Sequence, residues 1–254
     1  MPAEVWLLGD PVSRSLSPPM QNAAFDALHI DCRYVLHEVS RVDLSRVIDE
    51  LRGDERIVGA NVTIPHKEAV IRALDALDPL ARRIGAVNTI SRQGRRLRGS
   101  NTDIEGFVRA AEECGYPLDG IVAILGAGGA ARAVAAALQP QAREIRIVAR
   151  NLEQARRLCE DLGLDPGAAV EMDRIREAIA GVDLIVNATP ADLPHPSLLR
   201  PEQRVFDLRT RHSAEGRAML LHQGASSFEI WTERNAPIDV MRAALQTAAE
   251  ASLV

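Results

Sequence analysis

The sequence has few residues of several kinds, and each shortage excludes a class of protein. Only eight of its 254 residues are Phe, Trp or Tyr, which favours aliphatic packing of helices on sheets over an aromatic-rich sandwich. Its three cysteines, Cys32, Cys114 and Cys159, are an odd and scattered set, so no disulfide framework is expected. There is no Cys-x-x-Cys pair or His/Cys cluster, and we therefore expect no metal site.

Basic charge is not in excess either. Lys and Arg number 30 against 35 Asp and Glu, which gives a net charge of −5 and a pI near 5.7, and this balance disfavours nucleic acid or an anionic membrane as partner. No apolar run approaches the roughly 20 residues that span a bilayer. The N-terminus is not basic and its apolar run, Val5–Leu8, is too short for a signal peptide. With its cysteines read as reduced thiols, we expect a cytoplasmic protein; monomer and homodimer both stay open.

Short apolar runs alternate with segments of helical period through most of the chain. This alternation predicts an α/β protein whose parallel sheets are covered on both faces. Strands are expected at residues 5–9, 33–37, 57–62, 121–125, 145–149, 184–187 and 205–208, and helices at 18–28, 44–51, from Pro65, at 104–113, from 128, up to 162, at 217–228 and at 237–253. A polar break near 101–120 predicts two domains: an α/β substrate-binding domain (1–103 plus 216–254) and a Rossmann-like domain (104–215).

A glycine-rich turn joins the predicted strand 121–125 to the helix that follows it. It has the pattern G-x-G-x-x-A and consists of Gly126, Ala127, Gly128, Gly129, Ala130 and Ala131. The first glycine permits a tight turn, the second lets the backbone approach a pyrophosphate, and the small Ala131 keeps the helix close to the strand. With a strand before it and a helix after it, this pattern predicts a dinucleotide site rather than a plain strand–turn–helix junction.

The next strand indicates which dinucleotide is bound. NAD enzymes usually carry Asp or Glu about 20 residues after the glycines, where it bonds the ribose 2′-hydroxyl. Here the strand ends in Ala149, Arg150 and Asn151. A guanidinium presents a planar fork of donors that suits a 2′-phosphate, so Arg150 favours NADP; the alternative is that it lies unused on the surface.

The first half of the chain has small polar residues after several predicted elements. Four segments stand out: 13–19, 61–67, 85–89 and 101–103. Ligands of open α/β sheets bind beyond the carboxyl ends of the strands, so these segments can converge on one polyhydroxylated, anionic ligand. Taken singly, each Ser or Asn fits equally well as a helix cap or turn residue.

The residues of these motifs, and their order along the chain, resemble those of the shikimate dehydrogenase family. The segments that carry the resemblance are Gly9–Pro18, Asn61–Lys67, Gly85–Thr89, Asn101–Asp103, Gly126–Ala131 and Met219–Phe228. The resemblance covers most of the chain. It implies an NADP-dependent oxidoreductase that reversibly reduces 3-dehydroshikimate to shikimate, a step of the shikimate pathway toward aromatic amino acids.

The resemblance also implies a role for individual residues. Ser15 and Ser17 match the hydroxyls that bind the shikimate carboxylate, Thr63 lines the pocket, and the ring hydroxyls are contacted by Asn61, Asn88, Asp103 and Gln223. Lys67 and Asp103 match the catalytic pair, and both touch the substrate. Hydride delivery to a ketone leaves an alkoxide that needs a proton, which Lys67 can supply while Asp103 orients it. The cofactor residues implied are those of the glycine turn with Arg150, Asn187 and Thr189.

The sequence departs from the family pattern in several places. The Asn that usually precedes the 2′-phosphate Arg is Ala149, and a downstream basic residue is Gln154. After Asp207 the family continues with x-x-Tyr and a further helix–strand unit; here Thr210 replaces the Tyr and the unit is absent. These differences leave two alternatives open. One is a dehydrogenase for quinate, aminoshikimate or a related cyclic hydroxy acid, and the other is a non-catalytic NADP or shikimate sensor.

Overall fold

The computed structural model describes residues 2–252 and divides the chain into two compact units. The first contains residues up to Thr102 together with those from Leu220 onward, and the second is Asp103–Met219. The chain thus divides after residues 102 and 219, whereas the sequence analysis places the boundaries after 103 and 215. The α/β class with two domains is confirmed. Among the described residues, no helix is long and apolar enough to cross a membrane.

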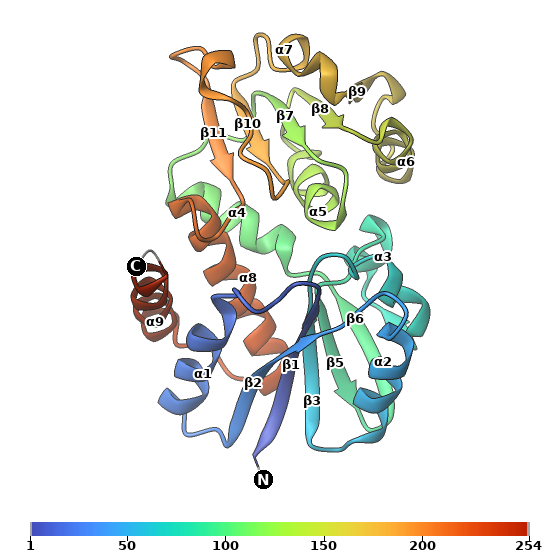
Figure 1. The fold of residues 1–254 in the computed structure, drawn as a ribbon, viewed down its shortest axis with the longest axis vertical. Helices are drawn as coiled ribbons and strands as arrows, with labels where there is room; N and C mark the ends of the chain where they lie inside the picture. The colour runs from blue at the N-terminus through green and yellow to red at the C-terminus, as the bar shows by residue number, and fades with distance from the viewer. Residues whose placement is uncertain (1, 253–254) are drawn as a thin grey trace. The chain divides into compact units, whose positions relative to one another are not determined.

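The first unit is a six-stranded sheet with helices on both faces (Figure 1). Its elements are β1 (Ala3–Gly9), α1 (Ser17–Ala27), β2 (Cys32–Glu38), α2 (Leu44–Gly53), β3 (Ile57–Val62), the 3-10 turn η1 (Ala69–Ala73), β4 (Ala76–Leu77), α3 (Pro79–Ile84), β5 (Thr89–Gln93), β6 (Arg96–Ser100), most of α8 (Ala214–Thr232) and α9 (Ile238–Ala251). The strand order is β2-β1-β3-β5-β6-β4. The predicted end of the last helix, Leu253, lies outside the described residues.

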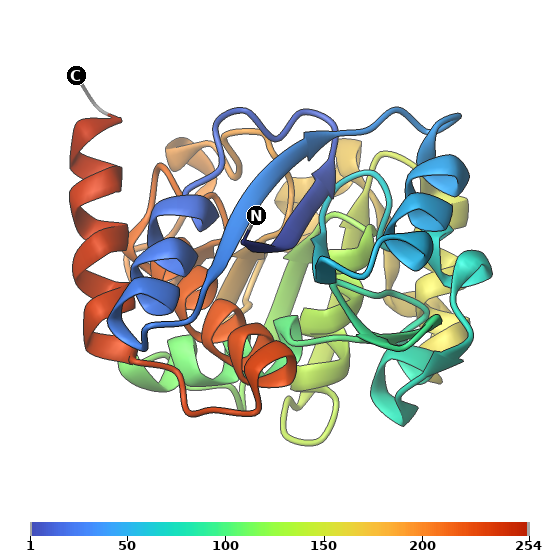
Figure 2. The ribbon, with the colours of Figure 1, turned by 90° about the horizontal axis from the view of Figure 1, so that it is seen from below.

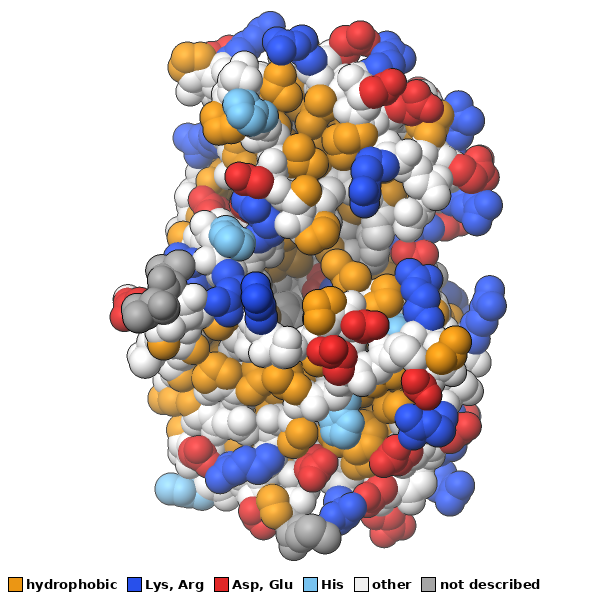
Figure 3. All heavy atoms as spheres, viewed as in Figure 1, with side chains coloured by type: hydrophobic (Ala, Val, Ile, Leu, Met, Phe, Trp, Pro, Cys, Tyr) orange, Lys and Arg blue, Asp and Glu red, His pale blue; other side chains and the backbone are white. Residues whose placement is uncertain are grey.

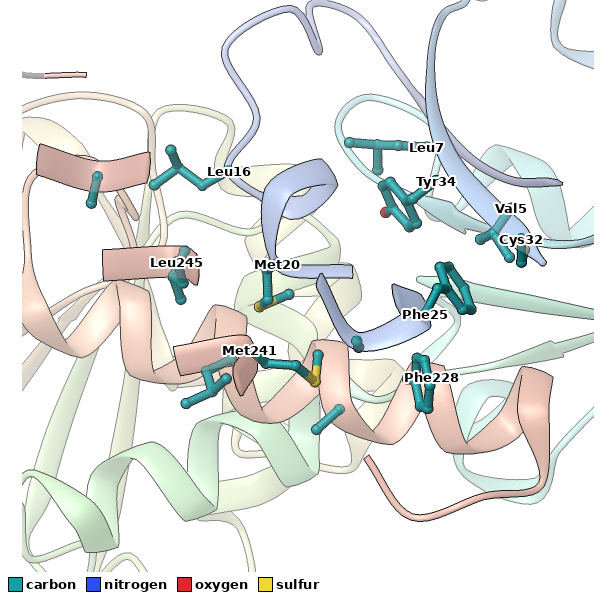
Figure 4. Packing of buried hydrophobic residues seen from close by; sticks show 14 of the residues in the cluster. Val5, Leu7, Leu16, Met20, Phe25, Cys32, Tyr34, Phe228, Met241 and Leu245 are labelled. Atoms are coloured by element: carbon teal, nitrogen blue, oxygen red, sulfur yellow. The ribbon is translucent and has the colours of Figure 1, made fainter. Parts of the chain in front are cut away.

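Alternation along β1 creates two cores, one on each face of this sheet. Val5 and Leu7 face α1, α8 and α9, whereas Trp6 and Leu8 face α2, as period-2 side-chain geometry requires. Figure 2 shows α1 and the red α9 on one side of β1 and β2, with α2 on the other. Figure 4 shows the first core, in which the rings of Phe25 and Phe228 lie 5.2 Å apart.

The expectation of parallel sheets is wrong for part of the first unit. β1 pairs in parallel with β2 and β3, but β5 is antiparallel to β3 and to β6. This β5–β6 hairpin was not predicted from the sequence. The segment is mostly polar, with Ile90 and Leu97 on either side of Gly94, which has a φ of 60°, and a glycine turn of this kind suits a hairpin.

The expectation of a helix opening at Pro65 is also wrong. Residues 63–68 form turns, and the helical turn that follows is the short η1. The N–H of His66 donates to the carbonyl of Thr63 (2.9 Å), and the carbonyl of Lys67 accepts from the N–H of Val87 (2.8 Å). Because that carbonyl accepts from the loop between α3 and β5, it does not take part in an i+4 helical bond.

The second unit is a five-stranded sheet that is parallel throughout, as predicted, but only four of its strands were expected and β9 was not. Its elements are α4 (Asp103–Glu113), β7 (Ile121–Leu125), α5 (Gly129–Leu138), β8 (Glu144–Ala149), α6 (Leu152–Leu162), η2 (Pro166–Ala168), β9 (Ala169–Glu171), η3 (Met172–Arg174), α7 (Ile175–Ala178), β10 (Leu184–Asn187), η4 (Pro196–Leu198) and β11 (Arg204–Asp207). The strand order is β11-β10-β7-β8-β9. The central β7 is a nearly continuous buried apolar run, as expected of a strand covered on both faces.

Candidate active site

A buried polar network lies at the carboxyl end of β3. Its centre is Asn61, which is 6% exposed. The Tyr34 hydroxyl donates to Asn61 Oδ1 (2.8 Å), and Asn61 Nδ2 lies within hydrogen-bonding distance of the Asn88 carbonyl (3.0 Å), Ser227 Oγ (3.0 Å) and Thr89 Oγ1 (3.2 Å). Partners on both sides of the amide fix its orientation, because oxygen and nitrogen are not interchangeable there.

Asn88 is the second centre of the same network and is 2% exposed. Its Oδ1 accepts from the N–H of Thr102 (2.8 Å), and its Nδ2 lies 2.9 Å from Thr102 Oγ1 and 3.3 Å from Gln223 Oε1. Gln223 and Ser227 are four residues apart on α8 and so share one face of that helix. The structure thus brings three of the predicted substrate residues, Asn61, Asn88 and Gln223, into one hydrogen-bonded cluster.

Hydroxyl groups dominate the amino end of α1. Ser15 Oγ accepts from the N–H of Ser17 (3.1 Å), where the helix begins. Pro18 and Pro19 follow and have no N–H, so most of the donors that a helix start normally offers are missing. The first turn contains no acidic residue, and a carboxylate there would depend mainly on the two hydroxyls.

Tyr34 links this helix start to the network. It is 3% exposed, and burial raises the pKa of its phenol while a hydrogen bond with Ser17 opposes that rise. The phenol therefore stays neutral and donates to Asn61. Ser17 is itself only 6% exposed, so this predicted carboxylate ligand lies beside the polar cluster.

Lys67 and Thr63 lie in the turn after β3, and both are half-buried. The buried ring of the neighbouring His66 holds this turn, with Nε2 lying 2.6 Å from the carbonyl of Val39. Lys67 is also the single lysine of the chain: of the 30 Lys and Arg residues, the other 29 are arginine. Lysine therefore stands at this position alone, although arginine serves at all the others.

Asp103, the other predicted catalytic residue, begins α4 and is 4% exposed. It belongs to the second unit, whereas Lys67 belongs to the first. A carboxylate in the first turn of a helix is favoured by the helix dipole. The position of Asp103 in the first turn of α4 therefore helps to explain why an acidic side chain can be buried there.

The glycine turn has the geometry expected of a dinucleotide site. Gly126 has a φ of 113°, a conformation that residues with a Cβ rarely adopt. At Gly128 an added Cβ would have no neighbour within 4 Å, so space remains over this backbone. Gly129, Ala130 and Ala131 form the first turn of α5, whose N-cap position makes no side-chain hydrogen bond. The N–H groups of this turn are thus available to phosphate oxygens.

The strand order places this turn where ligands bind in such sheets. β7 lies between β8 and β10, and the chain runs from β7 to β8 on one side and reaches β10 on the other. The crevice beyond the carboxyl ends of β7 and β10 is therefore the topological switch point. Asn187 ends β10 at this point and is fully buried.

The two residues predicted after β10 differ in what they offer a ligand. Asn187 Oδ1 accepts from the N–H (3.1 Å) and the hydroxyl (2.8 Å) of Thr189, and its Nδ2 donates to the carbonyl of Ala191 (2.9 Å) and approaches Asp207 Oδ1 (3.3 Å). Its polar atoms are thus used within the protein, which makes Asn187 a residue that shapes the loop. Thr189 is half-buried in that loop.

Arg150 lies exposed at the end of β8, and within the described chain it has no hydrogen bond or ion pair. The next residue, Asn151, caps α6 by accepting from the N–H of Gln154 (3.1 Å). The guanidinium therefore keeps its donors available at the carboxyl edge of the sheet. On the face of the molecule shown in Figure 3, acidic and basic side chains are interspersed.

Sequence reasoning missed Tyr34 and Ser227 as members of the network. For Ser227 a signal existed, because it follows Gln223 by four residues within a predicted helix. For Tyr34 there was none, since a tyrosine inside a strand is ordinary core composition. Among residues 2–252 no group of three or more His, Cys, Asp or Glu side chains is placed to hold a metal ion.

Three family models match the chain along most of its length. The shikimate dehydrogenase substrate binding domain matches residues 7–90, the shikimate/quinate 5-dehydrogenase model matches residues 111–205, and the shikimate 5′-dehydrogenase C-terminal domain matches residues 216–246. The three matches follow one another along the chain without overlap.

Individual relatives and solved structures agree with the family models. In an alignment 279 positions long, the chain is 42% identical to a shikimate dehydrogenase (NADP(+)) of Moorella thermoacetica. The alignment covers 98% of this chain and 94% of that one. A shikimate 5-dehydrogenase of Thermus thermophilus, crystallised with NADP(H) and shikimate, is 34% identical with a TM-score of 0.82 over 97% and 99% of the chains. A quinate dehydrogenase of Corynebacterium glutamicum in complex with NAD is 26% identical with a TM-score of 0.80 over 97% and 99%.

Proposed function

The chain belongs to the shikimate dehydrogenase family, and we propose that it catalyses the NADP-dependent, reversible reduction of 3-dehydroshikimate to shikimate. The observation that carries this proposal is the setting of Lys67. The chain's one lysine follows a strand whose end, at Asn61, joins a buried network of amides and hydroxyls. That combination suits a polyhydroxylated ring with a ketone to be protonated.

We propose that the first unit recognises the substrate. Ser15 and Ser17 present hydroxyls to its carboxylate, while Asn61, Asn88 and Gln223 present amides to the ring hydroxyls, with Thr63 beside them. Because the amides of Asn61 and Asn88 are already held by neighbours, they need little rearrangement when a ring arrives. Such preorganisation lowers the entropic cost of binding.

We propose that Lys67 is the proton donor in the reductive direction. NADPH supplies the hydride when it is bound. The Lys67 ammonium then protonates the oxygen that becomes the new alcohol, and in the oxidative direction the neutral amine removes that proton. Arginine would fail at this task, since its guanidinium keeps its proton at any ordinary pH. Asp103 accepts a hydrogen bond from the reacting hydroxyl and orients it for the transfer.

The residues of the second unit fit NADP. The uncapped first turn of α5 suits the pyrophosphate, the uncovered Gly128 backbone leaves room for it, and Arg150 has its donors available for the 2′-phosphate. Asn187 holds Thr189 and the rest of the loop beside this turn. The absence of a basic residue at Gln154 leaves one fewer positive charge for the 2′-phosphate than the family usually supplies.

The reaction we propose fits a reducing compartment such as the cytoplasm. All three cysteines are free thiols and two of them are buried, and a cytosolic protein keeps its thiols in that state.

A dehydrogenase for quinate or a related cyclic hydroxy acid is the second candidate, and a specific observation favours it. The quinate dehydrogenase of C. glutamicum has the same fold over nearly its whole length. In our proposal, Ser15 and Ser17 favour shikimate because both are serines and neither is a threonine, which would add a methyl group. The carboxylate of shikimate is on a flat ring carbon, whereas that of quinate is on a carbon that also carries a hydroxyl.

One assay tests the proposal and separates the alternatives. Purified protein is mixed with NADP and shikimate, and NADPH formation is followed by absorbance; the assay is repeated with quinate and with NAD. Turnover with shikimate and NADP is the expected result. Turnover with quinate but not with shikimate would overturn the substrate assignment. Tight binding of shikimate and NADP without turnover would show that the chain is a sensor.

A further inference from the structure

An arginine outside the family motifs connects the ends of β10 and β11. Arg209 Nε lies 2.8 Å and its Nη2 2.6 Å from Asp207 Oδ2, and the same Nη2 lies 2.7 Å from Asp192 Oδ1. Asp207 ends β11, whereas Asp192 belongs to the loop that leaves β10. One guanidinium therefore joins two segments about 15 residues apart in the chain.

The pair with Asp207 is sheltered, and the pair with Asp192 is open to solvent. The side chains of Arg209 and Asp207 are 18% and 14% exposed, whereas that of Asp192 is 91% exposed. The hydrogen bonds that Arg209 donates to Asp207 hold the pKa of its guanidinium above the usual range. Arg209 is thus fixed at one end by a sheltered carboxylate and reaches with the other toward the loop.

Asp207 is in turn connected to the loop that packs against the glycine turn. Asp207 Oδ1 lies 3.3 Å from Asn187 Nδ2, and Asn187 in turn holds Thr189 through its N–H and hydroxyl. A Cβ placed on Gly126 would lie 3.2 Å from both the carbonyl oxygen of Ala188 and Cγ2 of Thr189. The loop after β10 is therefore packed directly against the glycine turn.

The position of β11 in the sheet explains why this contact is needed. β11 is an edge strand of the five-stranded sheet. Among the described residues, no further strand flanks β11 to support the loop at this edge. Arg209 takes a position immediately after β11 from which it can hold the loop by side-chain bonds.

We propose that Arg209 is a positioning residue for the cofactor, holding residues 188–192 against the glycine turn so that the dinucleotide meets a formed site. This inference rests on the proposed function, since it concerns the same NADP site. It assigns to Arg209 no contact with the substrate. Its loss should therefore change affinity for the cofactor far more than affinity for shikimate.

The test is direct NADPH binding, measured by nucleotide fluorescence, with Arg209→Gln and Arg209→Lys. We expect Arg209→Gln to raise the Kd for NADPH about tenfold, which corresponds to about 1.4 kcal/mol. The KM for shikimate at saturating NADP should change less than about twofold. Arg209→Lys should recover part of the affinity, since an ammonium retains the charge but loses the fork of donors.

Arg146→Gln is the matched control. Arg146 is 23% exposed, pairs with Glu144 (2.7 Å) and donates to the carbonyls of Ala178 (2.8 Å) and Ala180 (3.1 Å). It lies in the first half of β8, and its bonds go to Glu144 and to residues that precede β10, not to the glycine turn or the loop after β10. Its loss should lower the melting temperature without a comparable change in the Kd for NADPH. Equal effects of the two substitutions on Kd would show that Arg209 acts only through overall stability.

A second variant, Asp192→Asn, distinguishes an effect on the position of the loop from an effect of charge on NADPH binding. This test does not require an Arg209 variant to fold. Removing this exposed carboxylate loosens the loop but also removes negative charge near an anionic cofactor. Weaker NADPH binding, by about two- to threefold, is expected from the loss of one solvent-exposed ion pair. Tighter or unchanged binding would overturn the proposal. If the unaltered protein fails to bind NADPH at all, the proposed function fails first.

Discussion

Replacing Lys67 by arginine is the sharpest perturbation that the structure offers. The Lys67→Arg variant would keep a positive charge and a long flexible side chain, but a guanidinium pKa above about 12 prevents proton donation near neutral pH. A positioned acid–base group contributes about 10²–10⁴ in rate. We therefore expect kcat to fall by about that factor, which corresponds to roughly 2.7–5.5 kcal/mol in the activation free energy.

The fold should tolerate this change. The carbonyl of Lys67 accepts from the N–H of Val87 (2.8 Å), and the ring of His66 holds the turn through the carbonyl of Val39 (2.6 Å). Neither bond involves the lysine side chain. Because that side chain is half-buried, its loss should cost at most about 1 kcal/mol of unfolding free energy, or about 2–4 °C in melting temperature.

The assay is initial-rate NADPH formation from shikimate across pH, with NADPH fluorescence and thermal unfolding measured on the same samples. Lys67→Met is the companion variant. If Lys67 only attracted the substrate's negative charge, Arg would restore activity and Met would raise KM. The exposed neighbour Arg72→Lys is a control that should leave kcat unchanged. A Lys67→Arg variant with kcat within about threefold of the unaltered protein would refute the assignment of proton transfer to Lys67.

Three further predictions concern other parts of the two units. Asn88→Ala should raise the KM for shikimate and lower the unfolding free energy in urea by about 1–3 kcal/mol, since the buried N–H of Thr102 loses its acceptor; an unchanged KM would remove Asn88 from the substrate site. Arg150→Gln should raise the KM for NADP about 10–100-fold, as expected for a lost charge-assisted bond, and should leave the KM for NAD unchanged; equal effects on both would contradict a 2′-phosphate contact. Burial raises the pKa of Cys32 to about 11, so near pH 8 the half-buried Cys114 should react first with a thiol reagent. Because folding favours the neutral Cys32 thiol, its contribution to stability should be complete below about pH 9 and be lost as pH rises toward about 11; rapid native reaction of Cys32 would contradict this.

The glycine turn and the parallel half of the fold were predictable because their signals are local. The strand before Gly126, the small residues of the turn and the apolar helix after it are all contiguous in the chain. Backbone sterics then leave little choice of conformation. The network around Asn61 was only partly predictable, because its partners Tyr34 and Ser227 lie 27 and 166 residues away in sequence. The spacing of Ser227 from Gln223 within a predicted helix was a signal for one of these partners, whereas nothing in the sequence pattern indicated Tyr34.

The error about strand direction explains how the substrate side is built. In a wholly parallel sheet, the start of β5 would lie at the edge opposite the end of β3, and Asn88 would be far from Asn61. Because β5 runs antiparallel to β3, Thr89 pairs with Asn61, and because β6 runs back along β5, Ser100 pairs with Thr89. The unpredicted hairpin therefore returns Asn88 and Thr102 to the edge where β3 ends, and it brings two of the four polar segments, each ambiguous alone, to the place where one ligand can meet them.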